Sequence, residues 1–171
     1  MSKSQNSNRK SPKSEARELF DRAYQQWEQK HPRQALRLFL AAAKAGDKGA
    51  LLNIGYFYDK GIGIRRNRSK AIYWYKRAYR HGDSGAANNI GTIWRDEHKM
   101  KQALSWFHKA VKLGNDGSNL EIAKHYLRGK HDAGKAIGFL NKVCRSNRVA
   151  EVELEEANRL LKEAKRNLKQ I

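Results

Sequence analysis

The chain has 171 residues with 36 Lys and Arg against 17 Asp and Glu, a formal net charge of +19. This charge exceeds what solubility requires and favours an acidic partner: a protein, a nucleic acid or an anionic membrane surface. The single cysteine, Cys144, excludes an intramolecular disulfide, and no stretch approaches the roughly 20 apolar residues of a membrane span.

The N-terminal stretch is polar and basic. Residues 1–13 contain four basic residues and no acid, which predicts a disordered arm. There is no apolar leader segment in this stretch, so we expect a cytoplasmic protein. Ser14 then precedes Glu15 and Glu18, so a helix is predicted to start there with acids in its first turn.

A repeat occupies residues 14–149. The alanines that lead its units are 36, 32 and 33 residues apart, and each lies eleven residues before a position where a helix is predicted to end. The alanines are Ala35, Ala71, Ala103 and Ala136, and the ends are Gly46, Gly82, Gly114 and Asn147. A period of this length, with only two prolines and no β-type alternation, predicts an all-α stack of helix pairs.

Each unit also carries signals for the start and the packing of its next helix. Asp47, Asp83 and Asn115 follow the three glycines and are expected to cap the helices that come next. Small residues follow nine positions after the glycines, and these predict close approach of a second helix. They are Gly55, Gly91 and Ala123.

One unit contains the run Gly55-Tyr56-Phe57-Tyr58-Asp59-Lys60-Gly61-Ile62-Gly63-Ile64, followed by Lys70-Ala71 and Trp74-Tyr75. With these residues at this spacing, the unit resembles a Sel1-like repeat, a relative of the tetratricopeptide repeats. Asn67 stands where the family usually has aspartate, and the unit that starts at Gly82 lacks the Gly-x-Gly. With drift, the resemblance covers about residues 15–147. It implies a right-handed α-solenoid of about four helix pairs that binds proteins and has no enzymatic activity.

The last segment, residues 150–171, has a different composition. Its apolar residues follow a helical period, with five acids early and five bases late, as the helix dipole favours. We interpret it as a helix that caps the final repeat. A dimerising helix is the alternative, although the apolar stripe is short for a coiled coil.

A basic face is predicted around residues 65–80. From Lys60 to Gly82 there are eight Lys or Arg and no acid. A helical wheel separates the apolar side of this helix from a basic side that carries one ring, Tyr73. Such a face is able to bind phosphates, with the ring stacking on a base, or to be only a solvated surface. Its residues are Arg65, Arg66, Arg68, Lys70, Tyr73, Lys76, Arg77 and Arg80.

The resemblance also implies a partner-binding groove, which the first helix of each pair lines in related proteins. Counted from the small residues, its positions are Leu52, Tyr56, Asp59, Asn88, Thr92, Arg95, Leu120, Lys124 and Leu127, with Phe20, Tyr24 and Trp27 less surely placed. Asn88 is expected either to hydrogen-bond a peptide backbone or merely to tolerate exposure. Tyr56 and Trp27 are either anchors for a partner or packing residues.

Signals for catalysis are weak. Gly61-Ile62-Gly63 lacks a third glycine and follows a helix, so it predicts a turn rather than a phosphate-binding loop. Glu121, His125 and His131 lack a further metal ligand at suitable spacing. Cys144 is expected to be a buried thiol. We therefore expect no metal, no cofactor and no small-molecule substrate.

Two functions remain at this stage. The first is a non-enzymatic protein-interaction module, either an adaptor, a regulator or an immunity- or inhibitor-type factor, with an acidic protein or peptide in its groove. The second is a nucleic-acid-associated factor that uses the basic face.

Overall fold

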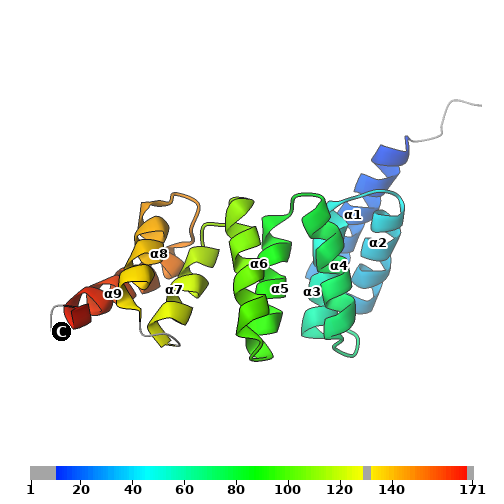
Figure 1. The fold of residues 1–171 in the computed structure, drawn as a ribbon. Helices are drawn as coiled ribbons and strands as arrows, with labels where there is room; N and C mark the ends of the chain where they lie inside the picture. Colours follow the sequence, from blue (N-terminus) through cyan, green and yellow to red (C-terminus); the bar gives the residue numbers. More distant parts are fainter. Residues whose placement is uncertain (1–10, 129–131, 169–171) are drawn as a thin grey trace, which may run out of the picture. The chain divides into compact units, whose positions relative to one another are not determined.

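The computed structural model describes residues 11–128 and 132–168, and these form nine helices without a strand (Figure 1). The all-α prediction is therefore confirmed. Two compact units divide the chain, residues 1–81 (unit 1) and 82–171 (unit 2). Unit 1 contains α1 (Pro12–Glu28), α2 (Pro32–Lys44), α3 (Gly49–Lys60) and α4 (Arg68–Arg80). Unit 2 contains α5 (Ser84–Asp96), α6 (Met100–Lys112), α7 (Ser118–Arg128), α8 (Ala133–Arg145) and α9 (Glu151–Leu168).

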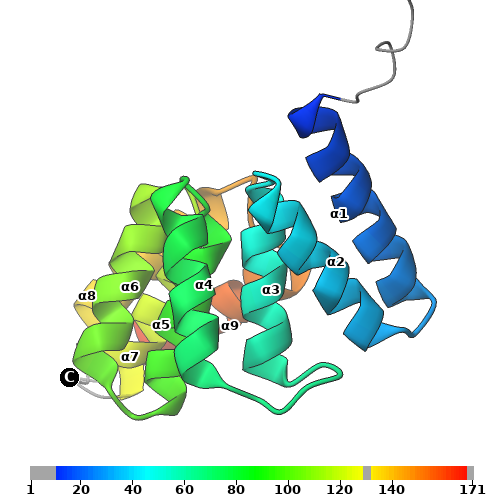
Figure 2. The ribbon, with the colours of Figure 1, turned by 90° about the vertical axis from the view of Figure 1, so that its right-hand side faces the viewer.

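Helices pack in chain order within each unit. In unit 1, α2 contacts α1 and α3, and α3 contacts α4 (Figure 2). In unit 2 each helix from α5 to α9 contacts the next, and α9 also contacts α7. This antiparallel succession is the expected result of short turns between amphipathic helices of similar length.

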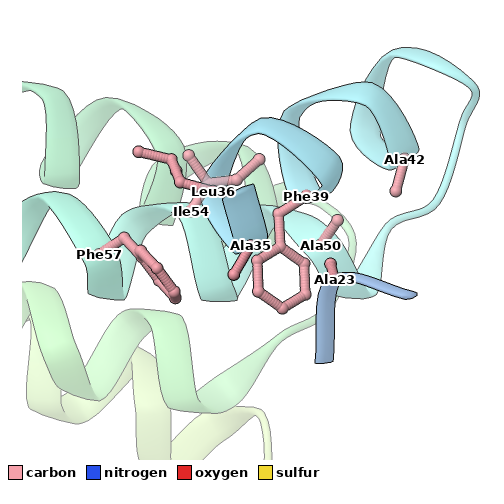
Figure 3. Packing of buried hydrophobic residues seen from close by; sticks show 8 residues of the cluster. All are labelled: Ala23, Ala35, Leu36, Phe39, Ala42, Ala50, Ile54 and Phe57. Atoms are coloured by element: carbon pink, nitrogen blue, oxygen red, sulfur yellow. The ribbon is translucent and has the colours of Figure 1, made fainter. Parts of the chain in front are cut away.

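The repeated alanines mark the buried side of the second helix of each pair. Ala35, Ala71, Ala103 and Ala136 have no exposed surface. Four residues after each of them comes a large buried side chain, which is Phe39, Tyr75, Phe107 or Leu140. Figure 3 shows the unit 1 core, in which Ala35 and Phe39 meet Ile54 and Phe57 of α3. The alanine thus admits the neighbouring helix, and the larger side chain fills the space beside it.

The helix ends agree with the predicted signals. Gly46, Gly82 and Gly114 have φ values of 102°, 87° and 90°, the left-handed conformation that ends a helix. The predicted caps are confirmed as well. Oδ1 of Asp47, of Asp83 and of Asn115 accepts a hydrogen bond from the backbone N–H three residues later, at 2.8, 2.8 and 3.1 Å.

The N-terminal cap of α5 allows a test of whether these side-chain hydrogen bonds stabilise the helices. Replacing Asp83 with alanine leaves the N–H of Ala86 without its 2.8 Å acceptor, so we expect the free energy of unfolding to fall by about 1 kcal/mol. Asp83→Asn retains an acceptor at the same place and should cost less. Urea denaturation of both variants measures the difference. An equal loss in both would show that the hydrogen bond is not the cause.

The two ends of the chain differ in part from the predictions. Helix α1 begins at Pro12 rather than after Ser14, because Oγ of Ser11 accepts from the N–H of Ser14 at 3.2 Å. Residues 11–13 therefore belong to the start of α1, and residues 1–10 of the predicted arm lie outside the described residues. Helix α9 packs its alanines, Ala157 and Ala164, inward and leaves Leu168 exposed.

Cys144 is half-buried rather than buried, and its thiol donates to Oδ1 of Asn158 at 3.3 Å. Among the described helices, none combines the length and the apolar character required to cross a lipid bilayer.

Candidate partner-binding surfaces

A row of aromatic rings lies along α1 and α3 of unit 1. Ring centroids are 5.5 Å apart for Phe20 and Tyr24, 5.7 Å for Tyr24 and Trp27, and 6.1 Å for Trp27 and Tyr56. We call these four residues the ring ladder. Tyr24 is 42% exposed, an unusual value for so large a side chain within an aromatic cluster.

The ladder rests on buried rings. Tyr24 contacts Phe39 edge-on at 5.9 Å, Trp27 contacts Phe57 at 5.4 Å, and Phe39 and Phe57 are 5.7 Å apart. Both supporting rings are fully buried. The ladder residues are therefore held in one arrangement before any partner arrives, which limits the entropy that binding would cost.

Cations lie at both ends of the ladder. The guanidinium of Arg17 is 5.4 Å from the centre of the Phe20 ring, and Nζ of Lys60 is 6.0 Å from that of Tyr56. Trp27 and Tyr56, which the sequence left as anchors or packing residues, pack together and also belong to this surface. Leu52, another predicted groove residue on α3, is half-buried.

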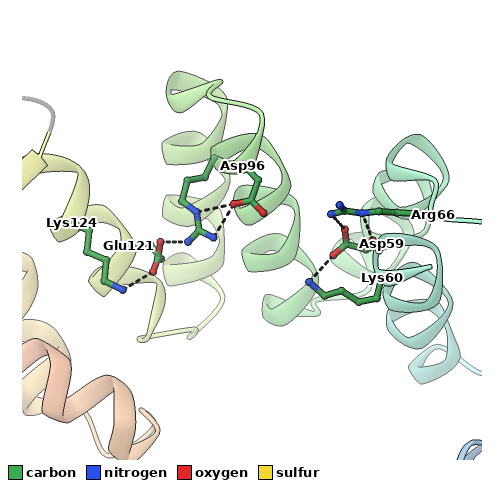
Figure 4. Close-up of polar contacts among 7 residues, drawn as sticks. Asp59, Lys60, Arg66, Asp96, Glu121 and Lys124 are labelled. Atoms are coloured by element: carbon green, nitrogen blue, oxygen red, sulfur yellow. Dashed lines mark hydrogen bonds and ion pairs between the residues drawn. The ribbon is translucent and has the colours of Figure 1, made fainter. Parts of the chain in front are cut away.

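Asp59 occupies a different position from the one that the groove interpretation requires. It is only 5% exposed, and its carboxylate pairs with Lys60 and Arg66, each at 3.4 Å (Figure 4). Arg66 also donates through Nε to the backbone oxygen of Asp59 at 2.6 Å. Asp59 therefore fixes the loop that follows α3 and is not presented to a partner.

Asn88 in unit 2 has a structural role that the sequence did not indicate. Oγ of the buried Ser118 donates to Oδ1 of Asn88 at 2.9 Å, and Oδ1 of Asn115 lies at the same distance from this hydroxyl. Asn88 thus ties α5 to the start of α7, thirty residues away. Thr92, one turn further along α5, is half-buried.

The remaining groove cations belong to a charge network in unit 2. Arg95 of α5 pairs with Glu121 of α7 and, at 3.0 Å, with Asp96 (Figure 4). Lys124 pairs with Glu121 at 3.1 Å and with Glu156 of α9 at 2.8 Å. Both cations are therefore neutralised within unit 2, and they link α5, α7 and α9.

The network shifts the protonation of its members. Burial by itself raises the pKa of Glu121, but the hydrogen bond from Arg95 and the charge of Lys124 outweigh it and hold this pKa below its ordinary value. Burial likewise lowers the pKa of Arg95, and the bonds and charges of Glu121 and Asp96 raise it above the ordinary value. Both shifts therefore favour the charged forms of Glu121 and Arg95.

Within the described residues, no group of three His, Cys, Asp or Glu side chains is placed to hold a metal ion. Glu121, which the sequence offered as a weak ligand, is committed to the network. His131, from the same candidate set, lies outside the described residues.

The basic face has the orientation that the helical wheel predicted. Lys70, Lys76 and Arg80 of α4 are exposed, as is Arg65 before the helix, while Arg68 and Arg77 are half-buried. Tyr73 is 57% exposed. The guanidinium of Arg77 lies 4.7 Å from the Trp74 ring centre and 5.9 Å from that of Tyr73.

The positive charge is concentrated in unit 1. Residues 1–81 contain 19 Lys and Arg against 6 Asp and Glu, whereas residues 82–171 contain 17 against 11. The ring ladder and the basic face both lie in unit 1. Unit 1 therefore attracts anionic groups more strongly than unit 2 does.

Comparison with known proteins identifies relatives for these repeats. Residues 29–47, 49–83 and 95–115 match the Sel1 repeat family. The chain is 32% identical over 76 residues to the putative sel1-like repeat-containing protein L21 of Acanthamoeba polyphaga mimivirus, covering 44% of this chain and 14% of that protein. It is 29% identical over 99 residues to the chitin synthase regulator SKT5 of Saccharomyces cerevisiae, covering 54% of this chain and again 14% of the relative.

The fold has a solved counterpart. A Sel1 repeat protein from Oxalobacter formigenes superposes with a TM-score of 0.69 at 21% identity, over 91% of this chain and 72% of that one. This likeness shows the fold alone. Because the chain spans only 14% of each of the two relatives above, their activities are not transferred to it.

Proposed function

We propose that the chain, which belongs to the Sel1 repeat family, is a non-enzymatic adaptor or regulatory module. Its partner is an acidic protein segment that binds along the ring ladder of unit 1. Sel1 repeat proteins are generally protein-interaction modules. The observation that carries the proposal is the exposed ring of Tyr24 within a supported row of rings.

Ring chemistry supports this choice. Aromatic side chains dominate the energetics of protein interfaces when they are held in a fixed arrangement and surrounded by polar groups. The ladder meets both conditions, since Phe39 and Phe57 support it and Arg17 and Lys60 lie at its ends. Both cations also pair with carboxylates of unit 1, Arg17 with Asp21 at 3.1 Å and Lys60 with Asp59 at 3.4 Å. The preference for an acidic segment therefore rests on the net positive charge of unit 1 as a whole.

The predicted groove residues enter this proposal in different ways. Leu52 and Tyr56 of unit 1 belong to the proposed partner surface, whereas Thr92 lies in unit 2 and has no part in it. Asn88, Arg95 and Lys124 join helices within unit 2, so the proposal gives them no contact with the partner.

The experiment is affinity capture of the partner from nuclease-treated native lysate, followed by titration of the purified pair. We expect Tyr24→Ala to weaken the complex at least about tenfold, equivalent to about 1.4 kcal/mol. Because Tyr24 also packs against Phe20, Trp27 and Phe39, the melting temperature should fall by about 2–4 °C, and the titration is made well below it. Tyr73→Ala removes a more exposed ring from α4, 57% against 42% for Tyr24, and should change the affinity less than about twofold. A loss with Tyr73→Ala and none with Tyr24→Ala would contradict the proposal.

A second candidate function is association with nucleic acid through the basic face. The exposed ring of Tyr73 beside Arg77, in a segment without acids, favours it. In that case binding should fall steeply with salt, by a factor set by the number of phosphates contacted. The charge-reversal variants Arg77→Glu and Arg80→Glu would then weaken binding, whereas Tyr24→Ala would not.

A further inference from the structure

Two cavities flank the loop between α3 and α4 in unit 1. The first, about 640 Å³, lies between this loop and the α1–α2 turn, and the second, about 620 Å³, lies between the loop and the start of α4. Ile64 and Arg65 line both. We call them the loop cavities.

No acidic residue lines either loop cavity, while several basic ones do. Lys30, Arg65 and Lys70 have exposed side chains and form no ion pair with any described residue. The other two arginines are committed to the protein itself. Nε of Arg33 donates to the backbone oxygen of Gly63 at 3.1 Å, and Arg66 is paired with Asp59. Three cations are thus left around the cavities without an anion.

The frame that carries these cations is fixed by backbone contacts. Gly61 and Gly63 both have positive φ, and a Cβ atom on Gly63 would lie 3.0 Å from Pro32. The N–H of Asn67 donates to the oxygen of Tyr58 at 2.8 Å, which closes the loop onto α3. Because the loop is pinned on both sides, the cavities exist before a ligand binds.

We propose that the loop cavities bind two carboxylates of one acidic segment of the partner protein. Lys30 and Arg65 hold the first carboxylate, and Arg65 and Lys70 hold the second. This inference rests on the proposed protein-binding function and names the chemistry that the partner brings to it.

The walls favour the side chain of an acidic residue over a nucleotide. Pro32 and Ile64 give the first cavity an apolar side that suits the methylene groups of glutamate. In the second cavity the ammonium of Lys70 lies 5.3 Å from the centre of the Tyr58 ring, so that ring is not open to a base. The exposed ring that suits stacking, Tyr73, lines neither cavity.

The cavities also continue the ring ladder. Phe20 lies against Gly49 at the start of α3, and Trp27 contacts Tyr56 near its end, so α1 and α3 run parallel here. Lys30 follows Trp27 by three residues, and Gly61 follows Tyr56 by five. A segment that extends along the ladder therefore reaches the first cavity at its end.

The test measures binding of a fluorescein-labelled deca-glutamate peptide by anisotropy at low ionic strength, with deca-glutamine and a dT10 oligonucleotide as comparison probes. The double variant Lys30→Gly, Arg65→Gln removes two cavity charges, and glycine suits the φ of 64° at position 30. Arg22→Gln, Lys48→Gln removes two exposed charges from unit 1, and Lys48 precedes the opposite end of α3, about 18 Å from the loop.

We expect the cavity variant to lower the affinity for deca-glutamate about tenfold and the control variant less than about threefold. Deca-glutamine should not bind. An equal loss in both double variants, or no binding of deca-glutamate to the wild type, would overturn the proposal. The proposal would also be overturned if dT10 bound more tightly than deca-glutamate and the cavity variant lost affinity for dT10 to the same extent. That result would show that the cavities bind phosphates.

The outcome is separable from the proposed function. Tyr24→Ala should leave deca-glutamate binding unchanged, since this peptide has no side chain for the rings. If the cavity variant kept its affinity for the peptide while Tyr24→Ala lost the protein partner, the loop-cavity proposal would be wrong and the ring-ladder proposal would stand. If instead the cavity variant lost the peptide while Tyr24→Ala kept the protein partner, the ring-ladder proposal would be wrong and the loop-cavity proposal would stand.

Discussion

Replacing Gly55 with alanine should lower the free energy of unfolding by about 2–3 kcal/mol. A Cβ atom at this position would lie 2.5 Å from the ring of Tyr75, which α4 holds with no exposed surface. The ring has no free space to enter, so α3 and α4 must move apart and lose contacts that extend along both helices. Urea denaturation followed by circular dichroism measures the loss.

A glycine in an open position provides the matched control. Gly138 lies within α8, and nothing lies within 4 Å of the Cβ atom it would gain. Gly138→Ala should therefore stabilise the protein by about 0.5–1 kcal/mol through helix propensity alone. Gly91→Ala should repeat the destabilisation in unit 2, because its Cβ atom would lie 2.6 Å from Phe107. If Gly55→Ala and Gly138→Ala had the same effect, close helix approach would not be the reason for the repeated glycine.

Replacing Glu121 with glutamine should cost about 2 kcal/mol at neutral pH. The substitution removes the charge that Arg95 and Lys124 share between α5 and α7. A fully buried pair costs about 3–5 kcal/mol when one partner is removed, and the 18% exposure of the Glu121 side chain lowers this figure. Lys135→Gln, which breaks an exposed pair with Asp132 at the start of α8, should leave stability almost unchanged.

The stability difference between wild type and Glu121→Gln should also depend on pH, and the direction of that dependence follows from the pKa of Glu121. The pKa of Glu121 is lowered in the folded state relative to its ordinary value of 4.5. Its contribution to stability is therefore complete above pH 4.5 and is lost as the pH falls through the lower folded pKa. The stability difference between wild type and Glu121→Gln should shrink over that acidic range. A difference that grows on acidification would contradict the assigned role of Arg95 and Lys124.

Local patterns in the sequence predicted the helical frame because each depends on neighbouring residues. The lead alanines, the glycines that end helices and the caps at Asp47, Asp83 and Asn115 all act within one turn of chain. The same applies to α4, where Asn67 caps the helix through Oδ1 despite replacing the usual aspartate of the family.

The functional surfaces were less predictable because they depend on residues that are distant in sequence. Asn88 meets Ser118 thirty residues away, and Lys124 meets Glu156 of α9. A carboxylate in a helix gives no local sign of which cation it will pair with, so the groove residues appeared available. Arg65 was recognised as basic, but its cavity also needs Lys30 of the α1–α2 turn, which the three-dimensional packing brings to it.

Site-specific photo-crosslinking from position 24 tests the central claim most directly. A photoreactive phenylalanine analogue replaces Tyr24 in one protein and Tyr73 in another, and each is irradiated in native lysate with and without nuclease. We expect one discrete protein to be cross-linked from position 24, to resist nuclease and to carry an acidic segment at the contact that mass spectrometry identifies. Nuclease-sensitive products from position 73, with none from position 24, would contradict it.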